Sequence, residues 1–118
     1  MEATEAARFE TLLLEQREVL RHQLVDMGAD PDDPNLERME GFDFGFADSA
    51  QSTAERNKVL AVVERLREQL GEVDHAIDKI PKGTYGVCER CGEPIALERL
   101  EALPAARLCL KDKQKEAH

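Results

Sequence analysis

Aromatic residues are scarce in this sequence, and tryptophan is absent. One tyrosine and four phenylalanines make up 4% of the 118 residues, whereas charged residues make up 35%. A chain of this size buries only about two thirds of its unfolded surface, so without bulky aromatic side chains we expect no large single core. The composition favours an extended protein that is rich in helix.

Long apolar runs are also missing. A membrane-spanning helix needs about 20 consecutive apolar residues, and charged residues interrupt the longest helical stretches here every two or three positions. Residues 1–10 carry glutamates where a secretion signal needs lysine or arginine, and they lack an apolar core of about seven residues. We therefore expect a soluble, cytoplasmic protein with no membrane partner.

Basic residues are outnumbered, and the net charge is −9. The window 28–50 holds seven acidic residues and one arginine, so it carries −6 of this charge. Such a surface repels the phosphate backbone, and the one basic run, at Lys111, Lys113 and Lys115, is too short for a DNA-reading face. We expect no direct DNA binding. The acidic residues of the window are Asp30, Asp32, Asp33, Glu37, Glu40, Asp43 and Asp48.

Apolar residues recur at helical spacing between Thr4 and Met27, which predicts a first helix. Thr4 can cap its start. Gly28 stands where a glycine in the left-handed conformation ends many helices. The stripe consists of Phe9, Leu13, Leu20, Leu24 and Met27, flanked by Leu12, Leu14, Val19 and Val25.

A second stripe follows a heptad pattern from Val59 to Ile80. Its spacings alternate between four and three residues, which is typical of a coiled-coil seam. Pro81 and Gly83 are expected to end this helix. Each stripe is too narrow for a globular core, so we predict that the two helices pack antiparallel as a coiled-coil hairpin over residues 1–80. The seam consists of Val59, Val63, Leu66, Leu70, Val73, Ile77 and Ile80.

The acidic segment around residues 28–50 is predicted to form the tip of this hairpin. It combines turn-forming residues, acids and three phenylalanines. It is either a solvated acidic loop or an interaction surface, because exposed aromatic side chains beside charges are typical of binding sites. Asp48 and Gln51 also match a helix capping box, so this aspartate is either a cap or a functional acid.

The most specific pattern lies in residues 81–118. Two residues separate Cys88 from Cys91, and seventeen further residues precede Cys109, which is followed three positions later by Asp112. This is the spacing of a zinc site made from two C-x2-C turns, with aspartate in the last position. We predict a zinc subdomain followed by a short C-terminal helix, because this segment has too few apolar side chains to fold without a metal.

The donor set leaves some alternatives open. Zinc with three thiolates and one carboxylate has the same formal charge as zinc with four thiolates, so Asp112 is acceptable, although oxygen is a harder ligand. A thioredoxin-like thiol pair needs a βαβ context, which nothing here indicates. No nucleophile with an adjacent base and no phosphate-binding glycine loop can be assembled, so we predict no catalytic residue and no enzyme. A small apolar cluster is expected at Ile95, Leu97 and Leu100, on a short helix that Pro104 ends.

Residues around the cysteines form one long motif: Tyr85-Gly86-x-Cys88-x2-Cys91-Gly92-x2-Ile95, then Arg99-Leu100-x-Ala102-x-Pro104 and Leu108-Cys109. This motif resembles the C4-type zinc finger of the DksA/TraR family of RNA polymerase-binding transcription factors. The resemblance is strong over residues 85–112. The preceding heptad helix and acidic segment match the hairpin of that family in their placement.

The resemblance implies a transcription regulator. Members of the family insert the hairpin into the secondary channel of RNA polymerase, bind no promoter DNA, and bring acids at the tip near the active site. Of the family's tip signature, Asp-x2-Asp-x-Ala, this sequence keeps Asp48 and Ala50, but Gly45 replaces the first aspartate, with Asp43 nearby. Arg65 falls where similar proteins use a basic residue against the channel rim. We expect Asp48, Ala50 and Arg65 to bind RNA polymerase, and we expect the protein to act as a monomer.

Two departures from the family pattern affect its ligands. Members that respond to guanosine tetraphosphate carry basic groups where this sequence has Glu72 and Leu103, and only Lys113 remains basic, so we expect little alarmone synergy. Asp112 replaces the fourth cysteine, and we expect zinc to be retained through the three thiolates. Two other functions stay open: a thiol-based stress sensor whose oxidation releases zinc, and a coiled-coil adaptor that pairs with a helical partner or with itself.

Overall fold

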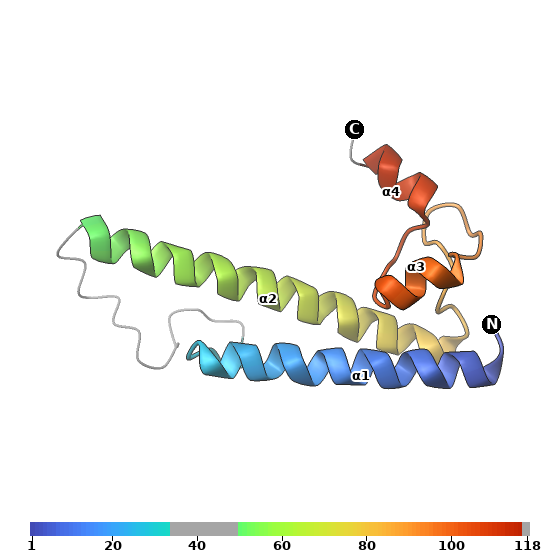
Figure 1. Cartoon of the computed structure of the whole chain (residues 1–118), viewed down its shortest axis with the longest axis horizontal. Coiled ribbons are helices and arrows are strands. Elements are labelled where there is room, and N and C mark those ends of the chain that lie inside the picture. Colours follow the sequence, from blue (N-terminus) through green and yellow to red (C-terminus); the bar gives the residue numbers. More distant parts are fainter. Residues whose placement is uncertain (34–49, 117–118) are drawn as a thin grey trace. The chain divides into compact units, whose positions relative to one another are not determined.

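The computed structural model describes residues 1–33 and 50–116, with the backbone alone for residues 50–53. These residues are mainly helical, as the sequence predicts, and none of their helices is apolar enough over a sufficient length to cross a bilayer. Within the same residues there is no strand, only one isolated antiparallel bridge. The helices are α1 (Ala3–Asp26), α2 (Ala50–Lys82), α3 (Leu97–Ala102) and α4 (Leu110–Glu116) (Figure 1).

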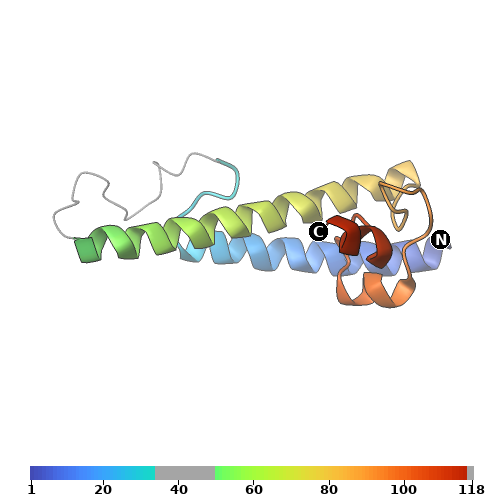
Figure 2. The same cartoon turned by 90° about the horizontal axis from the view of Figure 1, so that it is seen from above.

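The chain divides into two compact units, and both long helices contribute to each of them. The first unit contains Met1–Arg17 and Gly71–His118, and the second contains Glu18–Leu70. Within each unit the α1 segment lies beside the α2 segment and runs in the opposite direction (Figures 1 and 2). The predicted antiparallel helical hairpin is therefore confirmed.

The second unit has an apolar core that both helices supply. Leu24 lies near the end of α1, and Ala29 lies just after this helix. Val63, Leu66 and Leu70 come from α2. Burying each of the larger side chains contributes about 1.5–3 kcal/mol, so this seam is the main source of stability there. Partly buried residues pack around it: Leu20, Met27, Val59, Leu60 and Val62.

The end of α1 is fixed by Gly28, as the sequence predicts. Gly28 has a φ of 83°. Its N–H donates to the carbonyl of Val25 at 2.9 Å, and the N–H of Ala29 donates to the carbonyl of Leu24 at the same distance. These bonds and the burial of Ala29 against Leu24 define a Schellman ending.

The start of α1 differs from the prediction that Thr4 caps it. The helix begins at Ala3, and the N–H of Ala6 already donates to the carbonyl of Glu2 at 2.9 Å. Thr4 therefore lies inside the first turn, where its side chain cannot occupy the cap position.

The end of α2 also differs from the prediction. The helix continues through Pro81 to Lys82. It ends at Gly83, with a φ of 74° and a bond of 3.0 Å from the N–H of Thr84 to the carbonyl of Lys79. Proline removes one hydrogen bond in this last turn, but the glycine ends the helix.

The buried face of α2 changes sides near this end. Ile77 and Ile80, which the heptad pattern places in the core, are only half-buried, whereas Ala76 is buried and Lys79 is 8% exposed. Ala76 borders the heptad seam, about 60° around the helix from Val73, and Lys79 lies about 120° from Val73 in the same direction. Lys79 pairs there with Glu89, from the segment that follows α2, so a tertiary contact overrides the repeat at this position.

Candidate metal centre

Two cysteines lie on a tight turn after α2. The N–H of Gly92 donates to the carbonyl of Cys88 at 3.0 Å, and Gly92 has a φ of 77° that favours glycine. An isolated bridge between Val87 and Pro94 closes the turn. This turn places the thiols of Cys88 and Cys91 on the same side.

The other two candidate ligands lie at the start of α4. Cys109 directly precedes the helix, and Asp112 lies in its first turn. The N–H of Lys113 donates to the carbonyl of Cys109 at 2.9 Å, which fixes the first turn against the cysteine. Helix geometry therefore directs the side chains at positions 109 and 112 to the same side.

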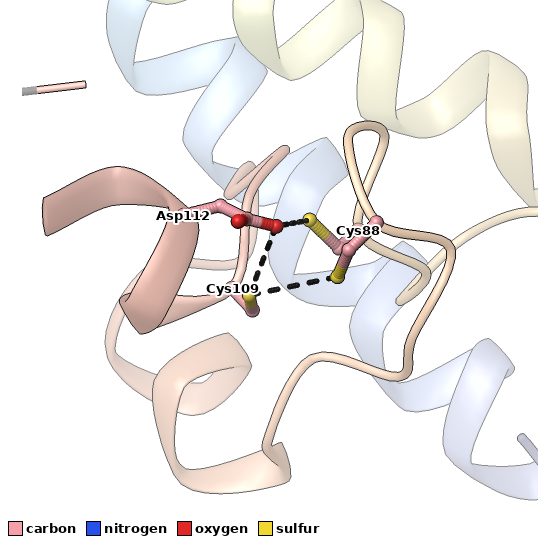
Figure 3. Close-up of side chains that lie close together, drawn as sticks. Cys88, Cys109 and Asp112 are labelled. Carbon is pink, nitrogen blue, oxygen red and sulfur yellow. Dashed lines mark hydrogen bonds between the residues drawn. The ribbon is translucent and has the colours of Figure 1, made fainter. Parts of the chain in front are cut away.

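The structure brings these four side chains together. The ligand atoms of Cys88, Cys91, Cys109 and Asp112 all lie within 4.8 Å of one another. Oδ2 of Asp112 is 3.0 Å from Sγ of Cys88 and 3.4 Å from Sγ of Cys109, and the sulfurs of Cys91 and Cys109 are 3.9 Å apart (Figure 3). The four residues named from their spacing in the sequence thus form one cluster.

The burial of the cluster is uneven. Cys88 is 1% exposed and Asp112 is also buried, whereas Cys109 is half-buried and Cys91 is exposed. Hydrogen bonds from the thiols, first that of Cys88 and then that of Cys91, hold the pKa of Asp112 at about 2 against the effect of burial. The carboxylate is therefore ionised at neutral pH and available to a cation.

The donor set fits a tetrahedral zinc ion. With Zn–S bonds of about 2.3 Å and Zn–O bonds of about 2.0 Å, the edges of the tetrahedron are about 3.8 Å between sulfurs and about 3.5 Å between sulfur and oxygen. The distances of 3.9, 3.0 and 3.4 Å in the cluster are close to these values. Three thiols and one carboxylate are ligands that zinc accepts.

The segment that follows α2, residues 83–116, has a small apolar core to which a residue of α1 also contributes. Tyr85, Ile95 and Leu100 are buried, and the ring of Phe9 lies 5.7 Å from that of Tyr85. The Tyr85 hydroxyl donates to the carbonyl of Pro104 at 2.8 Å, and burial raises its pKa to about 12. Leu97, which we expected in this cluster, is exposed.

Contacts around Glu89 are not evident in the sequence. Its carboxylate lies 2.7 Å from Nε2 of His75 and 3.0 Å from Nζ of Lys79, both on α2. Arg107 donates to the same carboxylate at 3.0 and 3.1 Å and to Glu72 at 3.3 Å. Burial raises the pKa of Glu89, but the hydrogen bonds from Arg107, Lys79 and His75 outweigh it and hold the pKa at about 2. These ion pairs connect residues that are far apart in the sequence, so no periodic pattern in the sequence predicts them.

The other predicted site residues are those assigned to binding RNA polymerase or the alarmone. Arg65 is exposed on α2, in the second unit. Ala50 is the first residue of α2 and has only its backbone described, and Asp48 lies outside the described residues. Of the positions tied to the alarmone, Glu72 pairs with Arg107, and Leu103 is 52% exposed.

The comparisons with known proteins agree with this geometry. The model of the prokaryotic dksA/traR C4-type zinc finger matches residues 83–111. General stress protein 16O of Bacillus subtilis is 37% identical over 110 residues, which cover 85% of this chain and 68% of that protein. The RNA polymerase-binding transcription factor DksA of Caulobacter vibrioides is 38% identical over 69 residues, covering 58% of this chain and 49% of the relative.

A solved structure is similar over nearly the whole chain. Transcription factor DksA2 from Pseudomonas aeruginosa superposes with a TM-score of 0.77 at 31% identity, covering 99% of this chain and 86% of that one. Together these findings show the helical hairpin and the zinc-finger region of proteins related to DksA. The chain belongs to the DksA/TraR family, which includes RNA polymerase-binding transcription factors.

Proposed function

We propose that this protein is a cytoplasmic regulator that binds RNA polymerase through its secondary channel and modulates initiation without binding promoter DNA. The observation that carries the proposal is the likeness to transcription factor DksA2 over 99% of the chain, with both hairpin helices included. The net charge of −9 supports the absence of DNA binding, because an acidic surface repels phosphates. In this proposal residues 1–80 form the part that enters the channel, and residues 81–118 form the finger.

We assign the effector role at the tip to Asp48, with Ala50 beside it in the signature. The test is a pull-down of core RNA polymerase by the purified protein, with transcription from a promoter that forms short-lived complexes measured in parallel. Asp48→Asn should still bind but lose the transcriptional effect. Glu15→Gln removes the same charge from the exposed face of α1 and should behave as wild type. Failure of every variant to bind the polymerase would reject the proposal.

Arg65 is the proposed contact with the channel rim. It is exposed on α2 and so is available to a partner. Arg65→Ala should weaken polymerase binding about 5- to 30-fold, because a charged contact at an interface contributes about 1–2 kcal/mol. Lys82→Ala, at the last residue of α2, should have little effect. Equal affinities for the two variants would remove Arg65 from the interface.

We propose that the cluster of Cys88, Cys91, Cys109 and Asp112 holds one zinc ion. When bound, the ion supplies structural stability by joining the turn after α2 to the start of α4. Freshly purified reduced protein should contain zinc in a 1:1 ratio. Asp112→Cys should tighten zinc binding and Asp112→Asn should weaken it, since a neutral amide is the poorer ligand. Equal affinities for these two variants would show that position 112 supplies no ligand.

We propose that guanosine tetraphosphate has little effect on this regulator. Glu72 adds a negative charge where the alarmone phosphates would need a cation, and Leu103 supplies none. A titration in the transcription assay should therefore give the same regulatory effect with and without the nucleotide. Strong enhancement would contradict this.

A thiol-based sensor is a second candidate, and the exposure of Cys91 favours it. Its sulfur lies 3.9 Å from that of Cys109. Oxidation of these two thiols by hydrogen peroxide would form one S–S bond and reduce the peroxide to two waters, so that two metal ligands are lost. Zinc release at low peroxide should then match the loss of the transcriptional effect. Release of zinc without that loss would reject the sensor.

We propose that the protein acts as a monomer. Sedimentation should show one chain per particle. A stable dimer would favour the coiled-coil adaptor instead.

A further inference from the structure

The carboxylate of Glu89 connects three parts of the first compact unit. Glu89 directly follows the candidate ligand Cys88, and its backbone N–H donates to the carbonyl of Arg107 at 2.9 Å. Its side chain accepts hydrogen bonds from Lys79 and Arg107 and lies within hydrogen-bond distance of His75. One residue therefore contacts the last turns of α2 and the segment that leads into Cys109.

The location of these contacts matters for the metal cluster. Cys88 and Cys109 lie on different segments, and zinc requires both within about 2.3 Å of the ion. Glu89 is next to the first of these ligands, and Arg107 is two positions before the second. A backbone bond and two side-chain bonds between Glu89 and Arg107 therefore hold the two segments at a fixed separation.

The contact with α2 is more than an exposed ion pair. The Glu89 side chain is 30% exposed, and a single pair at such a site contributes little to stability. Here the carboxylate has three cationic or potentially cationic partners, and the Lys79 side chain is 10% exposed. Ion pairs do contribute to stability when several charges form one network and a guanidinium makes two hydrogen bonds to one carboxylate. The contacts of Glu89 have this geometry.

We infer that Glu89 is a positioning residue of the metal centre: it holds the Cys88 turn against both the Cys109 segment and the end of α2. This inference rests on the proposed metal centre. Its consequence is reciprocal coupling. Metal binding orders the last turns of α2, and the contacts of Glu89 with α2 raise the affinity for the metal.

The test is the zinc affinity of the full chain, measured by competition with a chromophoric chelator. Glu89→Gln keeps the size of the side chain but removes its charge, and it should weaken zinc binding by about 10-fold or more, the lower end of what residues that orient metal ligands contribute. Glu93→Gln removes the same charge from an exposed side chain two positions after Cys91 and should change affinity less than about threefold. If both variants lose the same zinc affinity, the effect comes from the net charge near the site and not from the contacts of Glu89, and the inference is wrong.

Lys79→Met tests the same contact from α2, and it keeps the apolar stem of a buried side chain. It should weaken zinc binding by a smaller factor than Glu89→Gln. The double variant should be no weaker than Glu89→Gln alone, because both changes remove one shared interaction. Additive losses would show that Glu89 does not act through Lys79, and the coupling to α2 would be wrong.

Amide hydrogen exchange supplies a readout that affinity alone does not. In wild type, removal of zinc should accelerate exchange across residues 72–82, and this difference should shrink in Glu89→Gln. Circular dichroism should show unchanged helix content in Glu89→Gln. If wild type binds no zinc, the metal centre itself is wrong. If wild type binds zinc but residues 72–82 exchange equally with and without it, only the positioning role is wrong.

Discussion

The two compact units are stabilised by different interactions. The unit of Glu18–Leu70 contains a continuous apolar cluster that both long helices supply. The unit of Met1–Arg17 and Gly71–His118 also buries apolar side chains, such as Phe9, Tyr85 and Leu100, and it adds the charged contacts of Glu89 and the four candidate metal ligands. Apolar burial tolerates changes in detail, whereas ligands and hydrogen bonds need particular atoms at particular distances. We therefore expect the two units to respond differently to the same kind of change.

Removal of one metal ligand should have the largest effect and should be confined to the finger. Cys88→Ser should abolish stoichiometric zinc, because the buried ligand cannot be replaced by water at the same position. Amides of residues 83–112 should lose protection from hydrogen exchange, while those around Leu24 and Val63 keep theirs. Equal loss in both regions would show that the units do not differ in this way.

Truncation of the apolar seam should give the next largest effect. Leu24→Ala should lower the free energy of unfolding by about 2–5 kcal/mol, because it removes a fully buried side chain. The loss, measured by urea denaturation, should be the same with zinc and with a chelator. Val25→Ala, at an exposed position of the same helix, should change stability by less than about 0.5 kcal/mol. A loss for Leu24→Ala that depends on zinc would contradict the comparison.

Removal of one buried hydroxyl should lower the stability of the finger more than the loss of a single atom suggests. Tyr85→Phe keeps the ring against Phe9 but leaves the carbonyl of Pro104 without its donor, which costs about 1–3 kcal/mol. The loss should appear as a lower thermal midpoint of the zinc-bound protein. An unchanged midpoint would show that water replaces the hydroxyl and that the polar core of the finger is less specific than we argue.

A pair of glycines should give the smallest effects, and these should have opposite signs. Gly83 has a φ of 74°, so Gly83→Ala should destabilise the end of α2 by about 1 kcal/mol. Gly71 lies inside α2 at the boundary between the units, with space for a methyl group. Gly71→Ala should stabilise the protein by about 0.5–1 kcal/mol. Chemical denaturation measures both, and the same sign for the two would contradict the assignment of the helix end.

The sequence predicts the hairpin well because helix periodicity is a local and repeated property. The heptad from Val59 to Val73 and the glycine at position 28 each report on contacts within a few turns. The prediction fails where residues distant in sequence decide the outcome. Lys79 is buried where Glu89, from the segment after α2, pairs with it, whereas Ile80 of the heptad is only half-buried.

The candidate metal site shows the same limit. The cluster of Cys88, Cys91, Cys109 and Asp112 could be predicted because a zinc site imposes a spacing that is visible in the sequence. The contacts of Glu89 could not, because charged side chains are frequent here and any of them could pair with many others. Phe9 could be assigned to the buried stripe of α1, but its ring contact with Tyr85 depends on the fold of the finger.

The number of thiols in the cluster has a consequence of its own. With three cysteines, any disulfide within the chain leaves one thiol unpaired. A finger with four cysteines can instead form two disulfides. The pair at 3.9 Å, Cys91 and Cys109, would leave Cys88, which is 1% exposed. Aspartate in the fourth position therefore gives a finger whose unpaired sulfur is the one that a second molecule cannot reach.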